Sequence, residues 1–417
     1  MAGALTIALS TRETFERARS AAASLAQFSA DHKNRLLLQM ADALEAGTAQ
    51  ILGANEDDLK HAHLSDSLRD RLLLTPVRIR ETAKAVRDVA ALPDPVGELL
   101  ESWTRPNGLR IRKIRVPLGV VGIVYESRPN VTVDAAVLAF KSGNAVVLRG
   151  GKEAARSNQV LVEVLASVPG VPPGAIGLLD SSTRETVQEL ITARALVDVV
   201  IPRGGPDLIS HVIENATVPV IETGAGNCHI FVDESANLQM AGRIVLNAKT
   251  QRPSVCNAAE KLLVHASLAS DFVPRIVHEL TAAGVEVRGD EKTARLASGV
   301  KPATENDWGE EYLRLCIAIR VVSGFEEAIA HINRYSTKHS ESIITENSEH
   351  ARKFLRLVDS AAVYWNASTR FTDGAEFGFG AEMGISTQKL HCRGPFALRE
   401  LTSTKYEIIG RGQVRQG

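Results

Sequence analysis

The chain has 417 residues, of which 44% are hydrophobic and 23% charged, a balance typical of a soluble globular protein with two or three domains. Its formal net charge of −1 gives no reason to expect a nucleic acid or a membrane surface as a partner. The four cysteines form no CxxC pair, which disfavours a structural zinc site or a disulfide framework and suits a reducing compartment. The opening residues lack the basic start of a signal peptide, and no apolar run reaches the length of a membrane span, so we expect a cytoplasmic protein.

The first 90 residues or so are predicted to be helical. Ser10 and Glu13 have the spacing of a capping box at the start of a helix over 10–28. Within 31–46 the apolar residues share one helical face, which comprises Leu36, Leu37, Met40, Ala41 and Leu44. The helical pattern continues over 69–92 until Pro93 and Pro95 break it.

From residue 109 the pattern changes to strands. Alternation over 109–116 predicts a half-exposed strand or hairpin, and the apolar run at 118–126 is typical of a strand buried on both faces of a parallel sheet. Strands are then predicted at 144–151, 175–180, 196–205 and 218–223, and helices at 131–143, 153–168, 183–194 and 206–216. Such repeated βα units predict a doubly wound parallel sheet.

The alternation resumes after Gly226. Strands are predicted at 227–232, 259–265 and 315–322, with helices at 236–251, 268–284 and 325–336. This pattern indicates a second α/β domain. A glycine-rich stretch over 372–388 and a tail over 394–410 with strand character follow.

Cys256 is the first candidate for chemistry. It follows Pro253 in a predicted loop with Lys249 and Arg252 nearby, and positive neighbours favour the reactive thiolate. From the residues alone, a nucleophile and an inert loop cysteine remain equally open. Cys228 and Cys316 lie in apolar strands and are expected to be buried and inert, while Cys392 is expected to be a loop cysteine without a role.

Two glycine-rich turns follow predicted strands and open helices. They contain Gly150 and Gly151 in "LRGGK", and Gly204 and Gly205 in "PRGGP". Backbone N–H groups at such turns can bind phosphate, although spacing alone favours a plain tight turn. Arg149 and Lys152 add cations that suit a ribose 2′-phosphate, which favours NADP over NAD.

Glu222 ends a predicted apolar strand and is followed by two glycines in "ETGAG". Active sites of α/β folds lie at such carboxyl ends, while the alternative is a helix-capping or solvated acid. The histidines show no ligand spacing, so we expect no metal. The chain also lacks a GxSxG motif and a Walker A loop, which disfavours a serine hydrolase or a P-loop kinase.

Four long blocks resemble one known family. The segments "VPLGVVGIVYESRPNVTVDAAVLAFKSGNAVVLRGGKEA", "VPVIETGAGNCHIFVD", "NAKTQRPSVCNAAEKLLVH" and "STRFTDGAEFGFGAEMGISTQKLHCRGP" are similar to the gamma-glutamyl phosphate reductases, or glutamate-5-semialdehyde dehydrogenases, of the aldehyde dehydrogenase superfamily. The likeness runs along nearly the whole chain.

This resemblance implies an aldehyde dehydrogenase-like α/β fold with a Rossmann-like, doubly wound cofactor domain and a second α/β catalytic domain. The cofactor domain is expected over 1–225 with a return at about 363–390, and the catalytic domain over 226–362. Strands at 100–117 and 391–417 are expected to form a small β element for oligomerisation, which implies a homodimer or homotetramer.

The resemblance also implies site residues. Cys256 falls on the catalytic thiol, Asn130 is the available oxyanion amide, and Glu222 falls where hydrolytic members keep a general base. On the cofactor side, Arg149 takes the place of a ribose-binding lysine, and Glu311 falls near a glutamate that contacts the nicotinamide-side ribose. Because the substrate carries a phosphate and an α-carboxylate, three arginines inside the blocks are substrate-binding candidates, namely Arg128, Arg252 and Arg370.

The implied reaction is the reduction of L-glutamyl 5-phosphate by NADPH to L-glutamate 5-semialdehyde, phosphate and NADP+, the second step of proline synthesis from glutamate. Glutamate 5-kinase is a possible donor of the substrate. The alternatives are an NAD(P)-dependent hydrolytic or a CoA-acylating aldehyde dehydrogenase, which share the thiol but need no phosphate, and a non-catalytic scaffold with the same fold. An intact Cys256 disfavours the scaffold.

Overall fold

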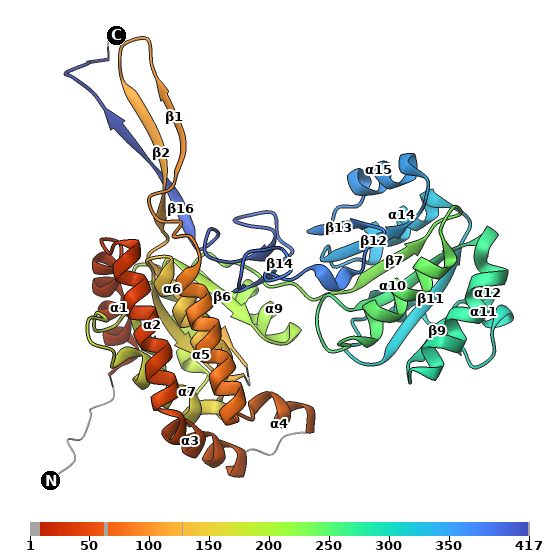
Figure 1. The fold of residues 1–417 in the computed structure, drawn as a ribbon, viewed down its shortest axis with the longest axis horizontal. Helices are drawn as coiled ribbons and strands as arrows, with labels where there is room; N and C mark the ends of the chain where they lie inside the picture. Colours follow the sequence, from red (N-terminus) through yellow and green to blue (C-terminus); the bar gives the residue numbers. More distant parts are fainter. Residues whose placement is uncertain (1–8, 62–65, 127, 416–417) are drawn as a thin grey trace. The chain divides into compact units, whose positions relative to one another are not determined.

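The computed structural model describes residues 9–61, 66–126 and 128–415. The chain forms two compact units (Figure 1). The first comprises Met1–Glu222, Gly380–Gly384 and Phe396–Gly417, and the second comprises Thr223–Phe379 and Ile385–Pro395. Residues 363–379 therefore group with the second unit, whereas the sequence analysis assigned them to the return of the cofactor domain.

Five helices open the first unit: α1 (Thr11–Leu25), α2 (Ala30–Ala46), α3 (Thr48–His61), α4 (Asp66–Leu72) and α5 (Pro76–Ala91). The predicted capping box is confirmed, because the Glu13 N–H donates to Ser10 Oγ and the Ser10 N–H donates to Glu13 Oε2. The predicted apolar face of α2 is buried. The single helical pattern over 69–92 is instead two helices, because Thr75 caps α5 and Pro76 lacks the N–H that would continue α4.

The first unit contains a parallel sheet in the order β5-β4-β3-β6. Its strands are β3 (Val120–Tyr125), β4 (Ala145–Arg149), β5 (Ile176–Leu178) and β6 (Val199–Arg203), and its helices are α6 (Pro129–Lys141), α7 (Ala155–Ala166), α8 (Glu185–Thr192) and α9 (Pro206–Asn215). The strand predicted at 218–223 is reduced to one parallel bridge between Val200 and Val220. Pro219 has no N–H to donate, which weakens any longer ladder there.

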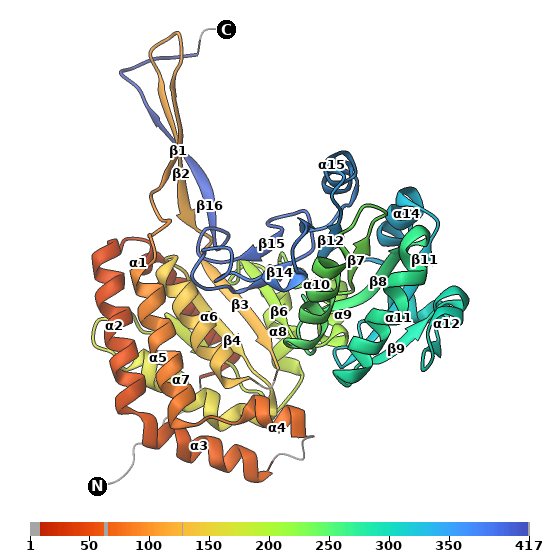
Figure 2. The same cartoon turned by 45° about the vertical axis from the view of Figure 1, so that its right-hand side comes forward.

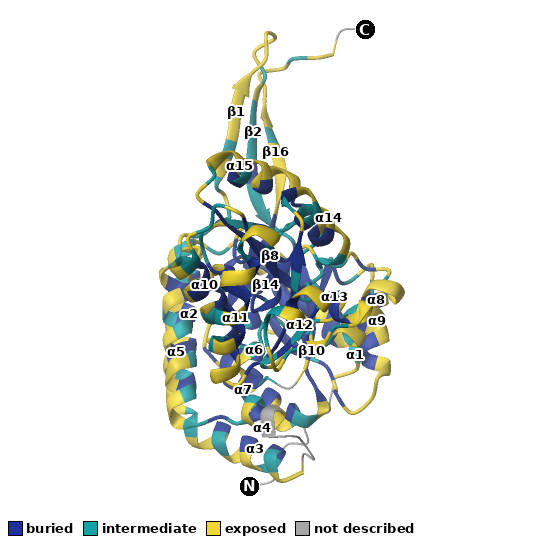
Figure 3. Cartoon of the chain, turned by 90° about the vertical axis from the view of Figure 1, so that its right-hand side faces the viewer, coloured by how far each residue is buried: buried dark blue, intermediate teal, exposed yellow. Residues whose placement is uncertain are grey.

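A three-stranded antiparallel sheet also belongs to the first unit. It pairs β1 (Leu99–Thr104), β2 (Arg110–Pro117) and β16 (Thr402–Ile409) in the order β1-β2-β16. Figure 2 shows this sheet extending away from the helices of the first unit. Most of its outer side chains are exposed, as the yellow strand β1 shows in Figure 3. Its predicted role in oligomerisation stays a prediction.

The second unit is built on a seven-stranded parallel sheet in the order β10-β9-β11-β8-β7-β12-β13. The strands are β7 (Cys228–Val232), β8 (Ala259–His265), β9 (Glu286–Gly289), β10 (Lys301–Pro302), β11 (Cys316–Val322), β12 (Ser340–Ile344) and β13 (Ala362–Trp365). The helices are α10 (Leu238–Thr250), α11 (Ala266–Ala282), α12 (Glu291–Leu296), α13 (Glu305–Gly309), α14 (Phe325–Tyr335) and α15 (Ser348–Leu357). Both predicted α/β sheets are thus confirmed.

Alternate strand residues of the second unit pack into separate cores on the two faces of its sheet. Ile230 and Leu262 pack with Phe272 on one face of the sheet, while Phe231 and Leu263 pack on the other. This division follows from the period of two along a strand. Two short turns of 3-10 helix, η1 (Lys152–Ala154) and η2 (Thr369–Phe371), and the short strands β14 (Gly384–Ser386) and β15 (Gly394–Phe396) complete the described elements. Within the described ranges, no helix is long and apolar enough to cross a membrane.

Candidate active site

Cys256 lies in the loop that leads from α10 into β8. Since α10 ends at Thr250 and Pro253 follows, the loop cannot continue as helix and reaches the amino end of β8. Cys256 is half-buried, whereas Cys228 and Cys316 are fully buried in strands, as predicted. None of the four cysteines, all within the described part of the chain, forms a disulfide.

The backbone carbonyl of Cys256 fits into a tight slot. A Cβ added to Gly226 would lie 1.4 Å from that carbonyl oxygen, so only glycine is compatible with this approach. The thiol of Cys228 donates to the same oxygen over 3.2 Å. The Ala258 N–H donates to the Val255 carbonyl over 3.1 Å and tightens the loop around the cysteine. The position of Cys256 is therefore fixed by contacts to its backbone carbonyl and by a hydrogen bond within its loop.

Arg370, one of the predicted substrate arginines, interacts electrostatically with Arg252 and with Cys256. Burial lowers the pKa of Arg370, the nearby charge of Arg252 lowers it further, and Cys256 acts in the opposite direction. The Arg370 Nε donates to Gln251 Oε1 over 2.8 Å, which directs this guanidinium along the loop. Cys256, Arg252 and Arg370 thus belong to the same unit, where Arg370 is linked to the other two by charge.

Asn257 ties the cysteine loop to the turn that carries Arg370. Its Nδ2 donates to the Thr372 carbonyl over 2.9 Å, and Thr369 Oγ1 donates to the Asn257 carbonyl over 2.7 Å. Asn257 is buried, so these bonds lie away from solvent. They fix η2, and with it Arg370, next to the residue that follows the thiol.

Lys249 lies within the predicted helix, as part of α10, and its ammonium group forms a buried ion pair. It lies at the buried end of α10, where its Nζ is 3.0 Å from Glu260 Oε2, and both side chains are fully buried. Burial raises the pKa of Glu260 to about 7 and lowers the pKa of Lys249, while each partner's charge opposes that effect. The cations beside the thiol are therefore Arg252 and Arg370, and the Lys249–Glu260 pair lies within the packed interior.

Glu311 forms a hydrogen bond with the backbone of Gly226. Its Oε1 accepts the Gly226 N–H over 2.6 Å. Burial raises the pKa of Glu311, whereas this hydrogen bond and the charges of Lys249 and Lys261 lower it. The residue predicted to contact cofactor therefore also holds the glycine that packs on the Cys256 carbonyl.

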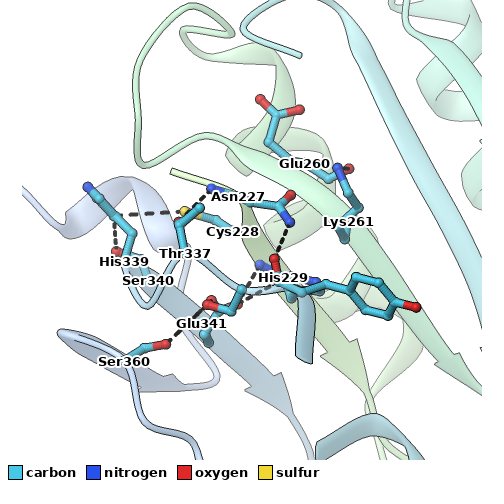
Figure 4. A network of polar contacts seen from close by, with 12 residues as sticks. Asn227, Cys228, His229, Glu260, Lys261, Thr337, His339, Ser340, Glu341 and Ser360 are labelled. Atoms are coloured by element: carbon cyan, nitrogen blue, oxygen red, sulfur yellow. Dashed lines mark hydrogen bonds and ion pairs between the residues drawn. The ribbon is translucent and has the colours of Figure 1, made fainter. Parts of the chain in front are cut away.

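A buried polar network continues from this turn, and Figure 4 shows its members. Asn227 Nδ2 donates to the Trp308 and Tyr335 carbonyls over 2.8 Å each, and its backbone N–H donates to Thr337 Oγ1 over 3.0 Å. His229 Nδ1 lies 3.1 Å from Glu341 Oε2. These residues were not predicted from the sequence. The signal for them was the presence of polar residues at the start of otherwise apolar strands, in "NCHIFV" and "HSESII".

In the first unit, the Arg149 guanidinium binds backbone carbonyls of neighbouring turns. Its Nη2 donates to the Thr183 carbonyl over 2.6 Å, and its Nη1 donates to the Gly150 carbonyl over 3.1 Å. Burial lowers its pKa. The guanidinium therefore anchors the turn after β5, and the neighbouring Lys152 is the exposed cation.

Both glycine turns are crowded by side chains. A Cβ on Gly150 would lie 2.2 Å from Asn158 Nδ2, and one on Gly151 would lie 2.2 Å from Glu153 Oε1. At the second turn, Gly204 lies against the Glu126 carboxylate, whose Oε2 accepts the Gly205 N–H over 2.8 Å. The start of α9 is therefore occupied by an anion from the same chain.

The remaining candidates also belong to the first unit. Arg128 is half-buried at the N-cap of α6, and Asn130 is exposed in its first turn, where its Nδ2 donates to Asp134 Oδ2 over 3.3 Å. Burial raises the pKa of Asp134 to about 6. Glu222 is half-buried and is the last residue before the second unit. The predicted residues thus fall into two sets, one within each unit.

Comparison with known proteins identifies the family. The sequence model of the aldehyde dehydrogenase family matches residues 5–303. The chain is 69% identical over 409 residues to the gamma-glutamyl phosphate reductase of Koribacter versatilis, covering 98% of this chain and 100% of that one. It is 57% identical over 418 residues to the same enzyme of Moorella thermoacetica, covering 99% and 100%. The crystal structure of gamma-glutamyl phosphate reductase from Thermotoga maritima superposes with a TM-score of 0.96 at 51% identity, covering 97% of this chain and 100% of that one. The chain therefore belongs to the aldehyde dehydrogenase family and, within it, to the gamma-glutamyl phosphate reductases.

Proposed function

We propose that the chain is an oxidoreductase that reduces L-glutamyl 5-phosphate to L-glutamate 5-semialdehyde with release of phosphate, the second step of proline synthesis from glutamate. The supporting observation is the cysteine loop, in which Cys256 is held by its carbonyl and flanked by Arg252 and Arg370. A thiol beside two cations suits attack on an acyl phosphate, whose leaving group is an anion. The high identity to relatives named for this activity supports the same reaction.

In the first half-reaction, the Cys256 thiolate attacks the γ-carbonyl carbon of the substrate. The new C–S bond forms as the C–O bond to the phosphoryl group breaks, and phosphate leaves with the electron pair of that bond. The product on the chain is a thioester at Cys256. No ATP is required, because the substrate already carries an activated acyl group.

The second half-reaction needs a hydride, which the family's nicotinamide cofactor supplies when bound. The thioester becomes a thiohemiacetal, which breaks its C–S bond to release the aldehyde and return the thiolate. Residues around Cys256 must hold the oxyanion in both halves. We assign this role to backbone N–H groups of the loop together with an amide, for which Asn130 is the candidate.

The first unit offers groups that suit a dinucleotide phosphate. Arg149 and Lys152 follow β4, and the backbones of Gly150 and Gly151 leave no room for a side chain. We therefore propose NADPH as the cofactor, with Lys152 as the exposed cation for the 2′-phosphate and Arg149 as the anchor of the adjacent turn. Gly204, Gly205 and Glu311 complete the proposed cofactor set.

Substrate charge is matched by arginines. Arg252 and Arg370 are assigned to the phosphate and α-carboxylate, with Arg128 as the further candidate in the first unit. Glu222 is assigned to positioning, because a base that activated water would discharge the thioester to glutamate. We also propose that the protein is cytoplasmic, that strands β1, β2 and β16 assemble it into a homodimer or homotetramer, and that glutamate 5-kinase hands over the substrate.

The test runs the reaction backwards. Purified protein is mixed with pyrroline-5-carboxylate, which equilibrates with the semialdehyde, and with NADP+, and NADPH absorbance is followed with and without inorganic phosphate. We expect phosphate-dependent NADPH formation that disappears in Cys256→Ala. Turnover that ignores phosphate would instead indicate a hydrolytic aldehyde dehydrogenase.

A further inference from the structure

Cys228 is a second cysteine close to the nucleophile loop. It is fully buried at the start of β7, and its Sγ lies 3.2 Å from the Cys256 carbonyl oxygen. A buried cysteine ordinarily serves as a small hydrophobic residue. Here its S–H has a specific acceptor, and that acceptor belongs to the residue that carries the reactive thiol.

The Cys228 hydrogen bond acts on the peptide group between Cys256 and Asn257, which rotates as one rigid plane. Because the peptide group is planar, holding the Cys256 carbonyl also fixes the direction of the Asn257 N–H and the backbone rotation of Cys256. Gly226 packs directly on the same carbonyl, where any Cβ would overlap the carbonyl oxygen. The direction of the Cys256 side chain therefore depends on how Cys228 and Gly226 hold this peptide.

A ring of polar contacts keeps Cys228 in place. His339 Nδ1 lies 3.9 Å from Cys228 Sγ and 2.8 Å from Ser340 Oγ, as the dashed lines in Figure 4 show. Ser340 Oγ lies 2.6 Å from Thr372 Oγ1, and the Thr372 carbonyl accepts from Asn257 Nδ2 over 2.9 Å. The ring thus begins at Cys256 and returns to Asn257, so it encloses the peptide between them.

The protonation states suit this arrangement. Burial raises the pKa of Cys228 well above its ordinary value, so the thiol keeps the proton that it donates. Burial lowers the pKa of His339 to about 4, so its ring is neutral at physiological pH. Neither group adds a charge beside the nucleophile.

We propose that Cys228 is a positioning residue for the reaction: its thiol donor, backed by His339 and Ser340, orients the Cys256 peptide so that the nucleophile and the loop N–H groups face the acyl carbon. The inference rests on the proposed function of Cys256. It makes Cys228 act through Cys256, without contact to substrate or cofactor.

The test compares three substitutions at one position with a matched control. Cys228→Ala and Cys228→Val remove the donor, the first with a loss and the second with a gain of side-chain volume, and Cys228→Ser keeps an O–H donor. Cys316→Ala is the control, because Cys316 is equally buried in the same unit and its Sγ lies near Glu286, 3.7 Å away. The readouts are kcat, both KM values, the melting temperature and the rate of Cys256 alkylation by iodoacetamide, measured by peptide mass spectrometry.

We expect Cys228→Ala and Cys228→Val to lower kcat and the alkylation rate of Cys256 about tenfold, the usual scale of one hydrogen bond, with both KM values unchanged. Cys228→Ser should recover most of both rates. Cys316→Ala should lower the melting temperature and leave both rates unchanged. Should Cys228→Ala not fold, the valine and serine variants decide.

The inference is overturned if Cys228→Ser is as slow as Cys228→Val, or if the alanine and valine variants lose only stability, as the control does. Failure of the proposed function looks different, since wild type would then show turnover that ignores phosphate, or Cys256→Ala would retain phosphate-dependent turnover. The alkylation rate reports on Cys256 in either case.

Discussion

The two parallel sheets carry their candidate residues at opposite ends. In the first unit these residues follow strands: Arg128 comes after β3, Arg149 ends β4 and Gly204 comes after β6. In the second unit Gly226 comes before β7 and Cys256 before β8, while Arg370 follows β13. The rule that α/β sheets bind ligands at their carboxyl ends therefore agrees with the candidate residues of the first unit, but not with the position of Cys256.

The two edges also differ in what they bury. At the carboxyl edge of the first sheet, backbone turns are held by carboxylates and carbonyls, and Lys152 and Asn130 are exposed. At the amino edge of the second sheet, Lys249, Glu260 and Glu341 have no exposed surface. Because a buried charge is costly unless it is paired, the second edge requires one particular arrangement, while the first tolerates rearrangement on binding.

The largest effect is expected for Gly226→Ala, which tests how rigid the amino edge of the second unit's sheet is. Gly226→Ala places a Cβ against the Cys256 carbonyl and must displace the loop, so we expect kcat to fall by at least about 100-fold, the scale of an ångström-sized misplacement. Steady-state kinetics measures it. Gly53→Ala, where a Cβ meets nothing within 4 Å, is the control and should keep full activity. Normal activity of Gly226→Ala would show that the Cys256 loop can shift without affecting catalysis.

The second prediction concerns the buried ion pair. Lys249→Met leaves Glu260 buried without its partner, so we expect the free energy of unfolding to fall by about 3–5 kcal/mol. Urea denaturation measures it. Arg295→Met removes an exposed pair with Glu291 and should have little effect. Equal effects from the two substitutions would mean that the Lys249 pair is no more important than a surface contact.

The third prediction places an acid sensitivity in the second unit. Burial, together with the charges of His229 and Arg320, lowers the pKa of His331 from 6.5 to about 3, and its Nε2 has no hydrogen-bond partner among the described residues. Since the unfolded chain binds this proton more tightly, the stabilising effect is present above pH 6.5 and is lost as pH falls toward 3. We expect wild type to lose up to about 1.4 kcal/mol per pH unit more than His331→Phe in this range.

Urea denaturation from pH 4 to 8 measures this difference. Above pH 7 the two proteins should show parallel pH dependence, which provides an internal control. An unchanged slope below pH 6 would indicate that His331 accepts its proton within the folded chain.

The smallest expected effect tests whether the first edge rearranges. Glu126→Gln removes the carboxylate that accepts the Gly205 N–H at the start of α9. If cofactor phosphate binds there, the dissociation constant of NADPH should fall roughly two- to fivefold, because an anion at a helix N-terminus is stabilised by about 0.3–1 kcal/mol. Fluorescence titration measures it, with Glu163→Gln on α7 as an exposed control. A weaker affinity would exclude Gly204 and Gly205 as the phosphate site.

Much of the fold could be predicted because local signals agreed with tertiary packing. Ser10 and Glu13 form their capping box, and the apolar run before Glu126 is a strand buried throughout. Strand β12 escaped prediction because Ser340, Glu341 and Ser342 are buried polar residues, and the cost of burying them is offset by hydrogen bonds to residues far along the chain. Hydrophobic periodicity cannot report such partners.

The candidate site shows the same limit. Cys256 stands out by its neighbours in sequence, but the sequence does not show that Lys249 is paired with Glu260, which lies 11 residues further along the chain. Cys228 looked like a core residue because its acceptor, the Cys256 carbonyl, is 28 residues away. Long-range hydrogen bonds of this kind leave no periodic trace in the sequence.

The antiparallel sheet has a consequence for synthesis on the ribosome. Arg115 on β2 and Thr402 on β16 share a hydrogen bond, yet 287 residues separate them. At about 5–20 residues per second, one edge of β2 waits roughly 15 to 60 s for its partner strand to be made. An unpaired edge is a template for association with other chains, so this sheet is most exposed to mispairing while the chain is still being translated.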